Sequence, residues 1–561
     1  VFFNQLKFPY PDIHLTLEKR TKAGDFDNKL YVDNDEYLKN KDKVIDEILK
    51  YKGDLGQLGE IRDKLKNKFK ELKSDLVIVF GDVTSTLAAA LAAKTLNIDI
   101  AHVESGLRSG DIKMPEEVNR ILTDHITKYY FITESSGIEN LKKIGVTDNV
   151  FLVGNTMIDT QKKYLQEAEN TKYYEKLKVD KKKYLLITLH RPSNVDNLIR
   201  LKDIFDNFDK LSKTYKLVYP IHPRTKANLK KIGYYEKVMS NSNIILTEPL
   251  GYLEFTCLMN NCFYVITDSG GLQEETTALN VPCFTLRENT ERPCTLIENN
   301  GTNQMISSLS EIELKECNSS MDLWDGKSSI RIRDIIYSFF FLNSLIITNE
   351  DTQTYEDILK NGFKMRRDLP YSKLKLPINY YEPLYKNDKN YIFGLHSWKH
   401  LIPYVFYYNK TRSRDILDSI INEICNWSNY NLDEKKIDIY NSVIWMDMSV
   451  GIRSQILSYL YLIDSSNKKV NNLIKLHKDF LLSTENWRNH NHCLWMCMGL
   501  ITLCIVTNEP QKNIDFCNDQ FNKILDSQYY DYIHTENSPE YHVYIYKQIL
   551  KIYNSKFFSD K

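Results

Sequence analysis

Several features that mark particular protein classes are scarce in this chain. Its 10 cysteines are scattered through 561 residues and form no CxxC pair, so neither a disulfide framework nor a zinc site is indicated. Lys plus Arg and Asp plus Glu both number 74, a balance that does not favour nucleic acid or an anionic membrane as a partner. No apolar run approaches the roughly 20 residues of a membrane span. We therefore expect a cytoplasmic protein with no metal, no cofactor and no membrane partner.

The length and the first residues set further expectations. A single hydrophobic core stops growing near about 250–300 residues, so 561 residues predict more than one domain. The sequence begins with Val1 rather than Met, without a signal-peptide pattern. Because Val1–Phe3 is typical of the inside of a structural element, we expect the sequence to be a fragment. Residues 21–50 are rich in Lys, Asp and Asn and predict a surface insertion.

The first half of the chain alternates between short apolar runs and helical segments. Continuous apolar runs of this length are typical of buried parallel strands. The predicted strands are Leu76–Phe80, Ile98–Val103, Tyr129–Ile132, Val150–Val153, Tyr184–Thr188, Leu217–Ile221, Asn243–Leu246 and Tyr264–Thr267. This rhythm predicts an α/β fold with two doubly wound sheets, a break near Lys162–Lys183 and a final helix at Ser328–Phe341.

Beyond about Asn349 the strand pattern ends and aromatic residues become dense. Helical periodicity is clear in Ile416–Trp427, Asp447–Ile463 and Cys493–Val506. The second half is therefore predicted to be all-α.

Acidic residues stand where the first two predicted strands end. Asp82 follows one strand and Glu104 the next, while Glu116 and Glu117 begin a helix farther along. Ligands of open α/β sheets bind at the carboxyl ends of the strands, so these residues form a candidate acid and base cluster. For Asp82 helix capping is an equal alternative, because Thr84 follows closely.

Two histidine-bearing turns also follow predicted strands. His190 is joined by Arg191, and His222 by Arg224. A lone histidine at a strand end is more often structural, and Ser193–Asn194 could cap a helix. Repeated cationic turns at strand ends nevertheless favour an anionic ligand.

The segment Thr267–Glu275 runs from a strand through Ser269, Gly270 and Gly271 into a helix. Such a turn presents backbone N–H groups to a phosphate, and a following acid can accept from ribose hydroxyls. Residues 287–293 add two arginines, whose forked guanidinium suits phosphate.

Together these segments resemble the non-hydrolysing UDP-N-acetylglucosamine 2-epimerases over about Val1 to Phe341. The motifs that carry the resemblance are Gly81–Asp82, His102–Ser109, Met114–Arg120, Leu152–Asn155, His190–Val195, Asp268–Glu275 and Thr290–Pro293. The resemblance implies two Rossmann-like domains in the glycosyltransferase-B arrangement, at residues 1–162 and 163–341, and a homodimer. The family's opening strand and its Gly-Thr-Arg-Pro-Glu segment have no counterpart here.

The resemblance also implies roles for individual residues. Asp82, Glu104, Glu116 and His190 fall on the family's catalytic positions. The positions around the substrate are Arg108, His222, Ser269, Gly270, Gly271, Glu275 and Arg292. The implied reaction eliminates UDP to give a 2-acetamidoglucal and then adds UDP back, with carboxyl groups as acid and base. The sequence does not assign which carboxyl is which.

The helical half carries two polar clusters, Asn486–His492 and His534–His542. Helix capping by Asn491 or Ser538 explains them equally simply, and their spacing matches no zinc site. With Trp398, Trp445 and Arg453 they resemble the α/α toroid of heparinase II/III-type polysaccharide lyases, over 371–561 after a linker at 342–370. That resemblance implies that Asn491 and His492 neutralise a uronate and that Tyr541 moves the proton. A module that only binds a polysaccharide is an equal expectation.

The leading hypothesis is a UDP-GlcNAc 2-epimerase that supplies surface polysaccharide synthesis, fused to a lyase-like helical domain. One rival is a UDP-sugar glycosyltransferase of the same two-domain architecture, which would not need the Glu104 and Glu116 carboxyls. A second rival is a catalytically inactive carbohydrate-binding protein.

Overall fold

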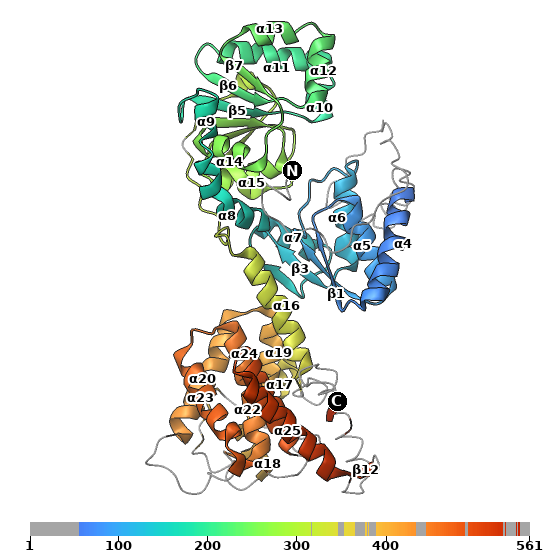
Figure 1. Ribbon diagram of the computed structural model, residues 1–561, viewed down its shortest axis with the longest axis vertical. Helices are drawn as coiled ribbons and strands as arrows, with labels where there is room; N and C mark the ends of the chain where they lie inside the picture. Colours follow the sequence, from blue (N-terminus) through green and yellow to red (C-terminus); the bar gives the residue numbers. More distant parts are fainter. Residues whose placement is uncertain are drawn as a thin grey trace. The chain divides into compact units, whose positions relative to one another are not determined.

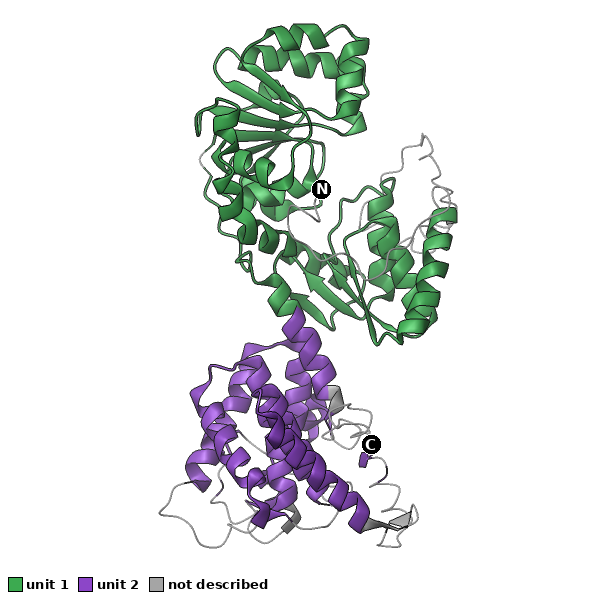
Figure 2. Cartoon of the chain, viewed as in Figure 1, with its two compact units in different colours: residues 1–332 green, residues 333–561 purple. Residues whose placement is uncertain are grey.

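The computed structural model describes residues 55–315, 317–345, 353–364, 376–378, 380, 389–432, 445–487, 492–530, 533–534, 546 and 548–549. The chain forms two compact units, Val1–Ile332 and Arg333–Lys561 (Figure 2). The segment Val1–Phe3 and the insertion expected at 21–50 lie outside the described residues.

The first unit contains a four-stranded sheet in the order β1-β2-β3-β4 (Figure 1). Its strands are β1 (Leu76–Phe80), β2 (Asp99–Val103), β3 (Tyr129–Ile132) and β4 (Val150–Leu152), and all of their pairings are parallel. The helices that accompany it are α4 (Leu55–Leu72), α5 (Thr84–Thr95), α6 (Pro115–Ile126) and α7 (Ser135–Lys143). The strands predicted from continuous apolar runs are confirmed to within one residue at each end.

The small side chains of α5 let this helix lie close to the sheet. Ala90 and Ala93 are fully buried and pack in one cluster with Val77, Val79 and Ile100. The Ala-rich run Leu87–Lys94 lies inside this helix.

The second sheet has six parallel strands in the order β10-β9-β8-β5-β6-β7. They are β5 (Tyr184–Thr188), β6 (Lys216–Pro220), β7 (Ile244–Thr247), β8 (Tyr264–Thr267), β9 (Cys283–Leu286) and β10 (Asn303–Ile306). The accompanying helices are α8 (Thr156–Asn170), α9 (Tyr173–Lys176), α10 (Pro192–Val195), α11 (Leu198–Leu211), α12 (Pro223–Lys231), α13 (Tyr235–Ser240), α14 (Tyr252–Asn261) and α15 (Gly270–Ala278). Short 3-10 turns follow: η1 (Pro293–Thr295), η2 (Ile297–Asn299) and η3 (Leu309–Glu311).

Strands β9 and β10 were not predicted from the sequence. Each has four residues, and β10 begins with the polar Asn303. Asn303 is nevertheless fully buried, because its amide donates to the carbonyls of Gln273 and Thr295 at 3.0 and 3.2 Å. A buried polar side chain with partners elsewhere in the chain leaves no apolar pattern to detect.

Helix α16 (Ser328–Ser344) extends three residues beyond its predicted end at Phe341. The division between the two compact units falls inside this helix. The boundary predicted between residues 162 and 163 likewise falls inside a helix, α8.

The second unit is helical apart from the two-residue strands β11 (Tyr529–Tyr530) and β12 (Ile533–His534), which pair antiparallel. Its helices are α17 (Tyr355–Asn361), α18 (Lys389–His396), η6 (Lys399–Leu401), α19 (Ile402–Thr411), α20 (Arg414–Asn431), α22 (Asp447–Ile463), α23 (Lys468–Leu482), η7 (Thr484–Asn486), α24 (Cys493–Val506) and α25 (Gln511–Gln528). The predicted helices at Asp447–Ile463 and Cys493–Val506 match in both bounds.

Helices α22 and α24 lie against each other and run in the same direction. A Cβ on Gly451 would lie 2.3 Å from the Trp495 carbonyl oxygen, and Ser458 Oγ donates to Thr502 Oγ1 at 3.1 Å. Both contacts join residues with the same separation along the chain, so the helices are parallel. Their first residues therefore share one end of the unit.

Among the described residues no helix is long and apolar enough to cross a membrane.

Candidate active site

The first candidate residue, Asp82, follows β1 and is held by helix α6. Its Oδ2 lies 2.5 Å from Nη2 of Arg120, whose side chain is 2% exposed. Asn119 Nδ2 donates to the Asp82 carbonyl at 2.9 Å. The N-cap residue of α5 is Val83, without a side-chain cap. The capping interpretation of Asp82 is therefore wrong, and its partly exposed carboxyl pairs with the buried Arg120.

Glu104 stands in a tight turn directly after β2. Its φ is +67°, a conformation that side-chain-bearing residues rarely adopt. The turn is held because the Glu104 and Ser105 N–H groups both donate to the Phe131 carbonyl, at 3.1 and 3.3 Å. A Cβ on Gly81 would lie 3.8 Å from Glu104 Oε2. The Glu104 carboxyl thus lies beside the turn that carries Asp82.

The buried Asp124 holds this region together. It accepts from His102 Nδ1 at 2.8 Å, Ser105 Oγ at 2.7 Å, the Gly106 N–H at 3.2 Å and Arg108 Nη2 at 2.7 Å. Although burial raises the pKa of Asp124, the Arg108 guanidinium and His102 together bring that pKa well below its usual range. Arg108, predicted to contact substrate, is thus largely engaged with the protein.

His102 links Asp124 to the turn after β1. Its Nε2 lies 2.8 Å from the Gly81 carbonyl and its Nδ1 contacts the Asp124 carboxyl. Both partners are acceptors, so the geometry favours a ring that carries hydrogen on both nitrogens. Neither His102 nor Asp124 was among the predicted site residues, because each lies within an element rather than at a strand end.

The two glutamates that begin α6 differ in environment. Glu116 is exposed, whereas Glu117 is buried. Glu117 accepts from the Ser109 N–H and Oγ at 2.8 and 3.0 Å and from the Gly110 N–H at 3.3 Å. Glu117 therefore shapes the loop after Arg108, and Glu116 is the one that solvent and a ligand can reach.

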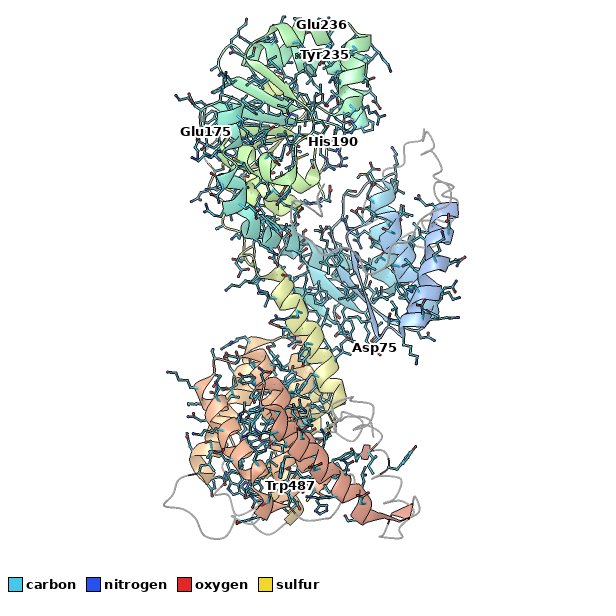
Figure 3. All side chains as sticks on the ribbon, viewed as in Figure 1. Asp75, Glu175, His190, Tyr235, Glu236 and Trp487 are labelled. Carbon is cyan, nitrogen blue, oxygen red and sulfur yellow. The ribbon has the colours of Figure 1, made fainter. Side chains whose placement is uncertain are left out.

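His190, which is labelled in Figure 3, follows β5. Its ring contacts the buried Asp268, which follows β8. Its Nδ1 is 3.1 Å from Asp268 Oδ1, and its ring is about half exposed. Asp268 also accepts from the His190 and Arg191 N–H groups and from Asn194 Nδ2. Asn194 thus binds Asp268 from inside α10, and the cap residue of α10 is Arg191, so the capping interpretation of Ser193–Asn194 is wrong.

His222 is exposed and caps helix α12. Its Nδ1 accepts from the Arg224 N–H at 3.2 Å. This bond leaves the hydrogen on Nε2, which makes His222 a neutral donor toward a ligand.

The turn into α15 is crowded by charged side chains. A Cβ on Gly270 would lie 2.9 Å from Arg292 Nη1 and from Glu291 Oε1, and 3.1 Å from Arg287 Nη1. A side chain at residue 270 would therefore displace the ends of these charged side chains. Arg287 is 3% exposed and donates through Nη2 to Glu291 at 3.1 Å. Among the described residues its Nη1 has no hydrogen-bond partner.

Arg292 is the centre of a buried charge cluster. Its Nε lies 2.7 Å from Glu274 Oε2, and its Nη1 pairs with Glu291. Asn155 Nδ2 donates to the other Glu274 oxygen at 2.9 Å. Burial raises the pKa of Glu274 to about 7 against the opposing effect of Arg292, and the Glu104 carboxyl contributes to the rise. The charge of Glu104, far away in the sequence, thus acts on the pKa values of this pair.

Glu275, the predicted ribose contact, is also largely buried. Tyr252 donates its hydroxyl to Glu275 Oε1 at 3.1 Å. Burial raises the pKa of Glu275 to about 7. Its second oxygen has no hydrogen bond among the described contacts.

Of the predicted lyase-like residues, Asn491 and Tyr541 lie outside the described residues. His492 precedes α24, is 42% exposed, and has its Nδ1 3.7 Å from Asp447 Oδ1 at the start of α22. Trp487, which lies nearby in the sequence, is labelled in Figure 3. Trp398 and Arg453 are fully buried, so they belong to the core of the unit. No three potential ligands among the described residues are grouped to hold a metal ion.

Comparison with known proteins matches the first unit to one family. A family model described as UDP-N-acetylglucosamine 2-epimerase matches residues 48–337. The UDP-N-acetylglucosamine 2-epimerase of Methanocaldococcus jannaschii is 39% identical over 327 residues, which cover 54% of this chain and 89% of that relative. The enzyme of the same name from Methanococcus maripaludis is 43% identical over 281 residues, which cover 47% of this chain and 76% of that relative.

Two solved structures are similar to parts of this chain. The complex of the M. jannaschii UDP-GlcNAc 2-epimerase with UDP-GlcNAc and UDP is 40% identical, and the match covers 50% of this chain and 80% of that one, with a TM-score of 0.45. A mutant heparan sulfate lyase HepC of Pedobacter heparinus is 17% identical over 42% of each chain, with a TM-score of 0.32. This second likeness is too low to establish a toroid, which stays a prediction. From the family match and the relatives' coverage, the chain belongs to the UDP-N-acetylglucosamine 2-epimerase family.

Proposed function

We propose that the first unit interconverts UDP-GlcNAc and UDP-ManNAc by eliminating and re-adding UDP, without net hydrolysis. The observation that carries the proposal is the position of Glu104, which lies beside the Asp82 turn and interacts with the Arg292–Glu274 pair. Acidic groups and guanidiniums are thereby gathered from both sheets. Inversion at C2 needs such a set, because a proton must leave one face of the sugar and return to the other.

The start of α15 is the proposed diphosphate site. A helix N-terminus attracts anions, and the open Nη1 of the buried Arg287 points to the same turn. Ser269, Gly270 and Gly271 would offer backbone N–H groups there, with Arg292 behind them. Glu275 would accept from the ribose hydroxyls, and Arg108 and His222 complete the proposed substrate contacts.

Asp82, Glu104, Glu116 and His190 are the proposed catalytic residues. His190, oriented by Asp268, would stabilise the negative charge that develops on the departing diphosphate. The carboxyl groups would remove and return the C2 proton. A carboxyl whose pKa lies near neutrality would serve both directions of such a reversible transfer.

We also propose that the protein works in the cytoplasm, where UDP-sugars are made, and that it is a homodimer, as the family resemblance implies. Light scattering behind a sizing column tests the oligomeric state directly. A single species of monomer mass at micromolar concentration would exclude the dimer.

For the helical unit we propose a contact with polysaccharide through Asn491, His492 and Tyr541. One observation favours it, because His492 and Asp447 meet where the parallel helices α22 and α24 both begin. A carboxyl beside an imidazole fixes the orientation of the ring. Binding of uronate-containing polysaccharides to the full chain, compared with a His492→Ala variant, tests the proposal.

Proton NMR of UDP-GlcNAc in D2O tests the epimerase. Deuterium at C2 together with a UDP-ManNAc signal is the expected result. A chimera that places the family's opening strand and Gly-Thr-Arg-Pro-Glu segment before Val1 controls for the segment without a counterpart here. No exchange with either protein would overturn the proposal: sugar transfer to an added acceptor would then support the transferase, and binding without turnover the carbohydrate-binding protein.

A further inference from the structure

One contact in the first unit joins loops of the two sheets and involves a cysteine. Glu134 follows β3 and is 6% exposed. One of its carboxyl oxygens accepts from Ser136 Oγ, and the other accepts from Cys294 Sγ. Cys294 belongs to η1, which follows β9 of the second sheet. Residues 160 positions apart thus share a partly buried thiol–carboxyl contact.

On the Glu134 side, this contact is connected to the turn that carries Glu104. The first turn of α7, directly after Glu134, packs against the turn that carries Glu104: a Cβ on Gly106 would lie 2.4 Å from the Gly137 carbonyl oxygen. Asn140 Nδ2, one turn farther, donates to the Gly106 carbonyl at 3.0 Å. Movement of the Glu134 turn would therefore move Glu104.

On the other side, the contact leads to Arg292. The Thr295 N–H and Oγ1 donate to the Arg292 carbonyl at 3.1 and 2.8 Å, so η1 moves with Arg292. The turn that carries Glu134 has a further contact, because Trp324 Nε1 donates to the carbonyl of the preceding residue, Thr133, at 3.1 Å. The Glu134–Cys294 contact is thus a polar side-chain link between the Glu104 turn and the Arg292 segment.

The chemistry of the pair requires a protonated thiol. An ionised Glu134 carboxylate has no hydrogen to donate and acts only as an acceptor. In that state the Cys294 Sγ must carry the hydrogen of this contact. Burial and the adjacent Glu134 both raise the pKa of the Cys294 thiol. Ionisation or alkylation of Cys294 would remove the donor and leave two electron-rich groups in contact.

We propose that Glu134 and Cys294 are a positioning pair that keeps Glu104 and Arg292 in the mutual arrangement needed for turnover. This inference rests on the proposed function for its kinetic consequence. The contact itself has consequences that do not depend on any activity.

The first experiment measures alkylation of the full-length chain by iodoacetamide at pH 8, followed by peptide mass spectrometry. Cys317 is the internal reference, because it is partly exposed and has no carboxyl contact among the described residues. Replacing the carboxylate in Glu134→Gln should speed labelling of Cys294 about tenfold, since the thiolate no longer meets an anion. Labelling of Cys317 should not change. Equal alkylation rates of Cys294 in the parent protein and in Glu134→Gln would overturn the proposed pairing.

The second experiment is a kinetic double-mutant cycle on C2 exchange. Cys294→Ala should lower kcat about tenfold with little change in KM, while Cys294→Ser, which keeps a donor, should retain most of the activity. The Glu134→Gln/Cys294→Ala double variant should be no slower than the worse single variant, and Cys317→Ala should match the parent protein.

The outcomes separate the two proposals. If the parent protein exchanges C2 hydrogen and the Cys294 variants equal it, the positioning role fails while the epimerase stands. Additive losses, or a Ser variant as slow as the Ala variant, would also overturn the positioning role. If the parent shows no exchange, the proposed function fails, and the alkylation rates still decide whether the pair exists.

Discussion

Each of the two units buries an arginine, and the side chains that surround the two arginines are of opposite kinds. In the first unit Arg292 lies among carboxyl groups, 2.7 Å from Glu274. In the helical unit Arg453 is fully buried, and no carboxyl among the described residues forms an ion pair with it. It donates through Nε to His477 Nε2 at 2.9 Å and through Nη1 to the His396 carbonyl at 2.6 Å.

Aromatic rings surround the second arginine. Its guanidinium carbon lies 4.6 Å from the Trp427 ring centre, 5.7 Å from that of Trp445 and 5.8 Å from that of Trp398. Burial lowers the pKa of Arg453 to about 9. The pKa of Arg292 is instead raised, because Glu274 and Glu291 outweigh the effect of burial.

The neighbouring histidines complete the contrast. Burial, followed by the charge of Arg453, lowers the pKa of His396 to about 3 and that of His477 well below its usual range. The histidines around Arg453 are therefore neutral, and they serve as acceptors and packing groups. A buried charge among carboxyls is poised for chemistry, whereas one among indoles and neutral imidazoles stabilises a core.

The largest expected effect concerns the carboxyls of the first unit. Glu104→Gln should lower C2 exchange by about a thousandfold or more, because an amide cannot move the proton. Exchange is measured by NMR in D2O with UDP-GlcNAc. The exposed Glu236→Gln in α13 is the matched control and should not differ from the parent. Retention of more than a tenth of the rate in Glu104→Gln would remove this residue from the chemistry.

Replacing the arginine of the helical core should affect stability rather than exchange. Arg453→Ala leaves a cavity among three indoles and should cost about 3 kcal/mol or more of unfolding free energy. Arg453→Met keeps most of the volume and removes the buried charge, so it should cost less. Denaturation followed by tryptophan fluorescence measures both. If the Met variant is as unstable as the Ala variant, the charge and not the packing is what this core requires.

A smaller loss of unfolding free energy is expected for a substitution where α22 packs against α24. In Gly451→Ala the new methyl would lie 2.3 Å from the Trp495 carbonyl, so the helices must separate at a cost of about 1–3 kcal/mol. Gly59 lies within α4 with nothing within 4 Å of its would-be Cβ. Gly59→Ala should therefore gain about 0.5–1 kcal/mol from helix propensity. Equal stabilities for the two variants would contradict the close packing.

The last comparison sets two similar glutamates side by side and concerns the pH dependence of stability. Glu275 accepts from Tyr252, and Glu423 of the helical unit accepts from Tyr380 at 2.6 Å. Burial raises the pKa of each to about 7. Between about pH 4.5 and 7 the folded chain then holds more protons than the unfolded one, so stability falls as pH rises, by at most about 1.4 kcal/mol per pH unit for each group.

Glutamine variants test that dependence. Glu423→Gln should flatten the loss of stability of the helical unit between pH 4.5 and 7. Glu275→Gln should flatten that of the first unit and also weaken UDP binding, as measured by calorimetry. Unfolding curves at half-unit pH steps give the slopes. An unchanged slope in either variant would show that its carboxyl titrates in the ordinary acidic range.

Much of the α/β half could be predicted, since buried parallel strands leave continuous apolar runs. The predicted runs at Leu76–Phe80, Tyr184–Thr188 and Tyr264–Thr267 match the strands in both bounds. The candidate site could be predicted for a related reason: ligand-facing residues follow strand ends, and Asp82, Glu104 and His190 all do so. Their partners could not be predicted, because Arg120 and Asp268 come close to them only when the chain has folded.

The sequence by itself determined the two parallel sheets, the helical second half and the strand-end positions of the acidic residues, because these follow from local periodicity and short motifs. Only the tertiary structure decided that Asp82 pairs with Arg120 rather than capping a helix. It alone brought Glu104 within electrostatic reach of Arg292 and placed Cys294 against Glu134. The reason is physical: a buried charge takes whichever partner the packing of distant segments supplies, and no local pattern records that choice.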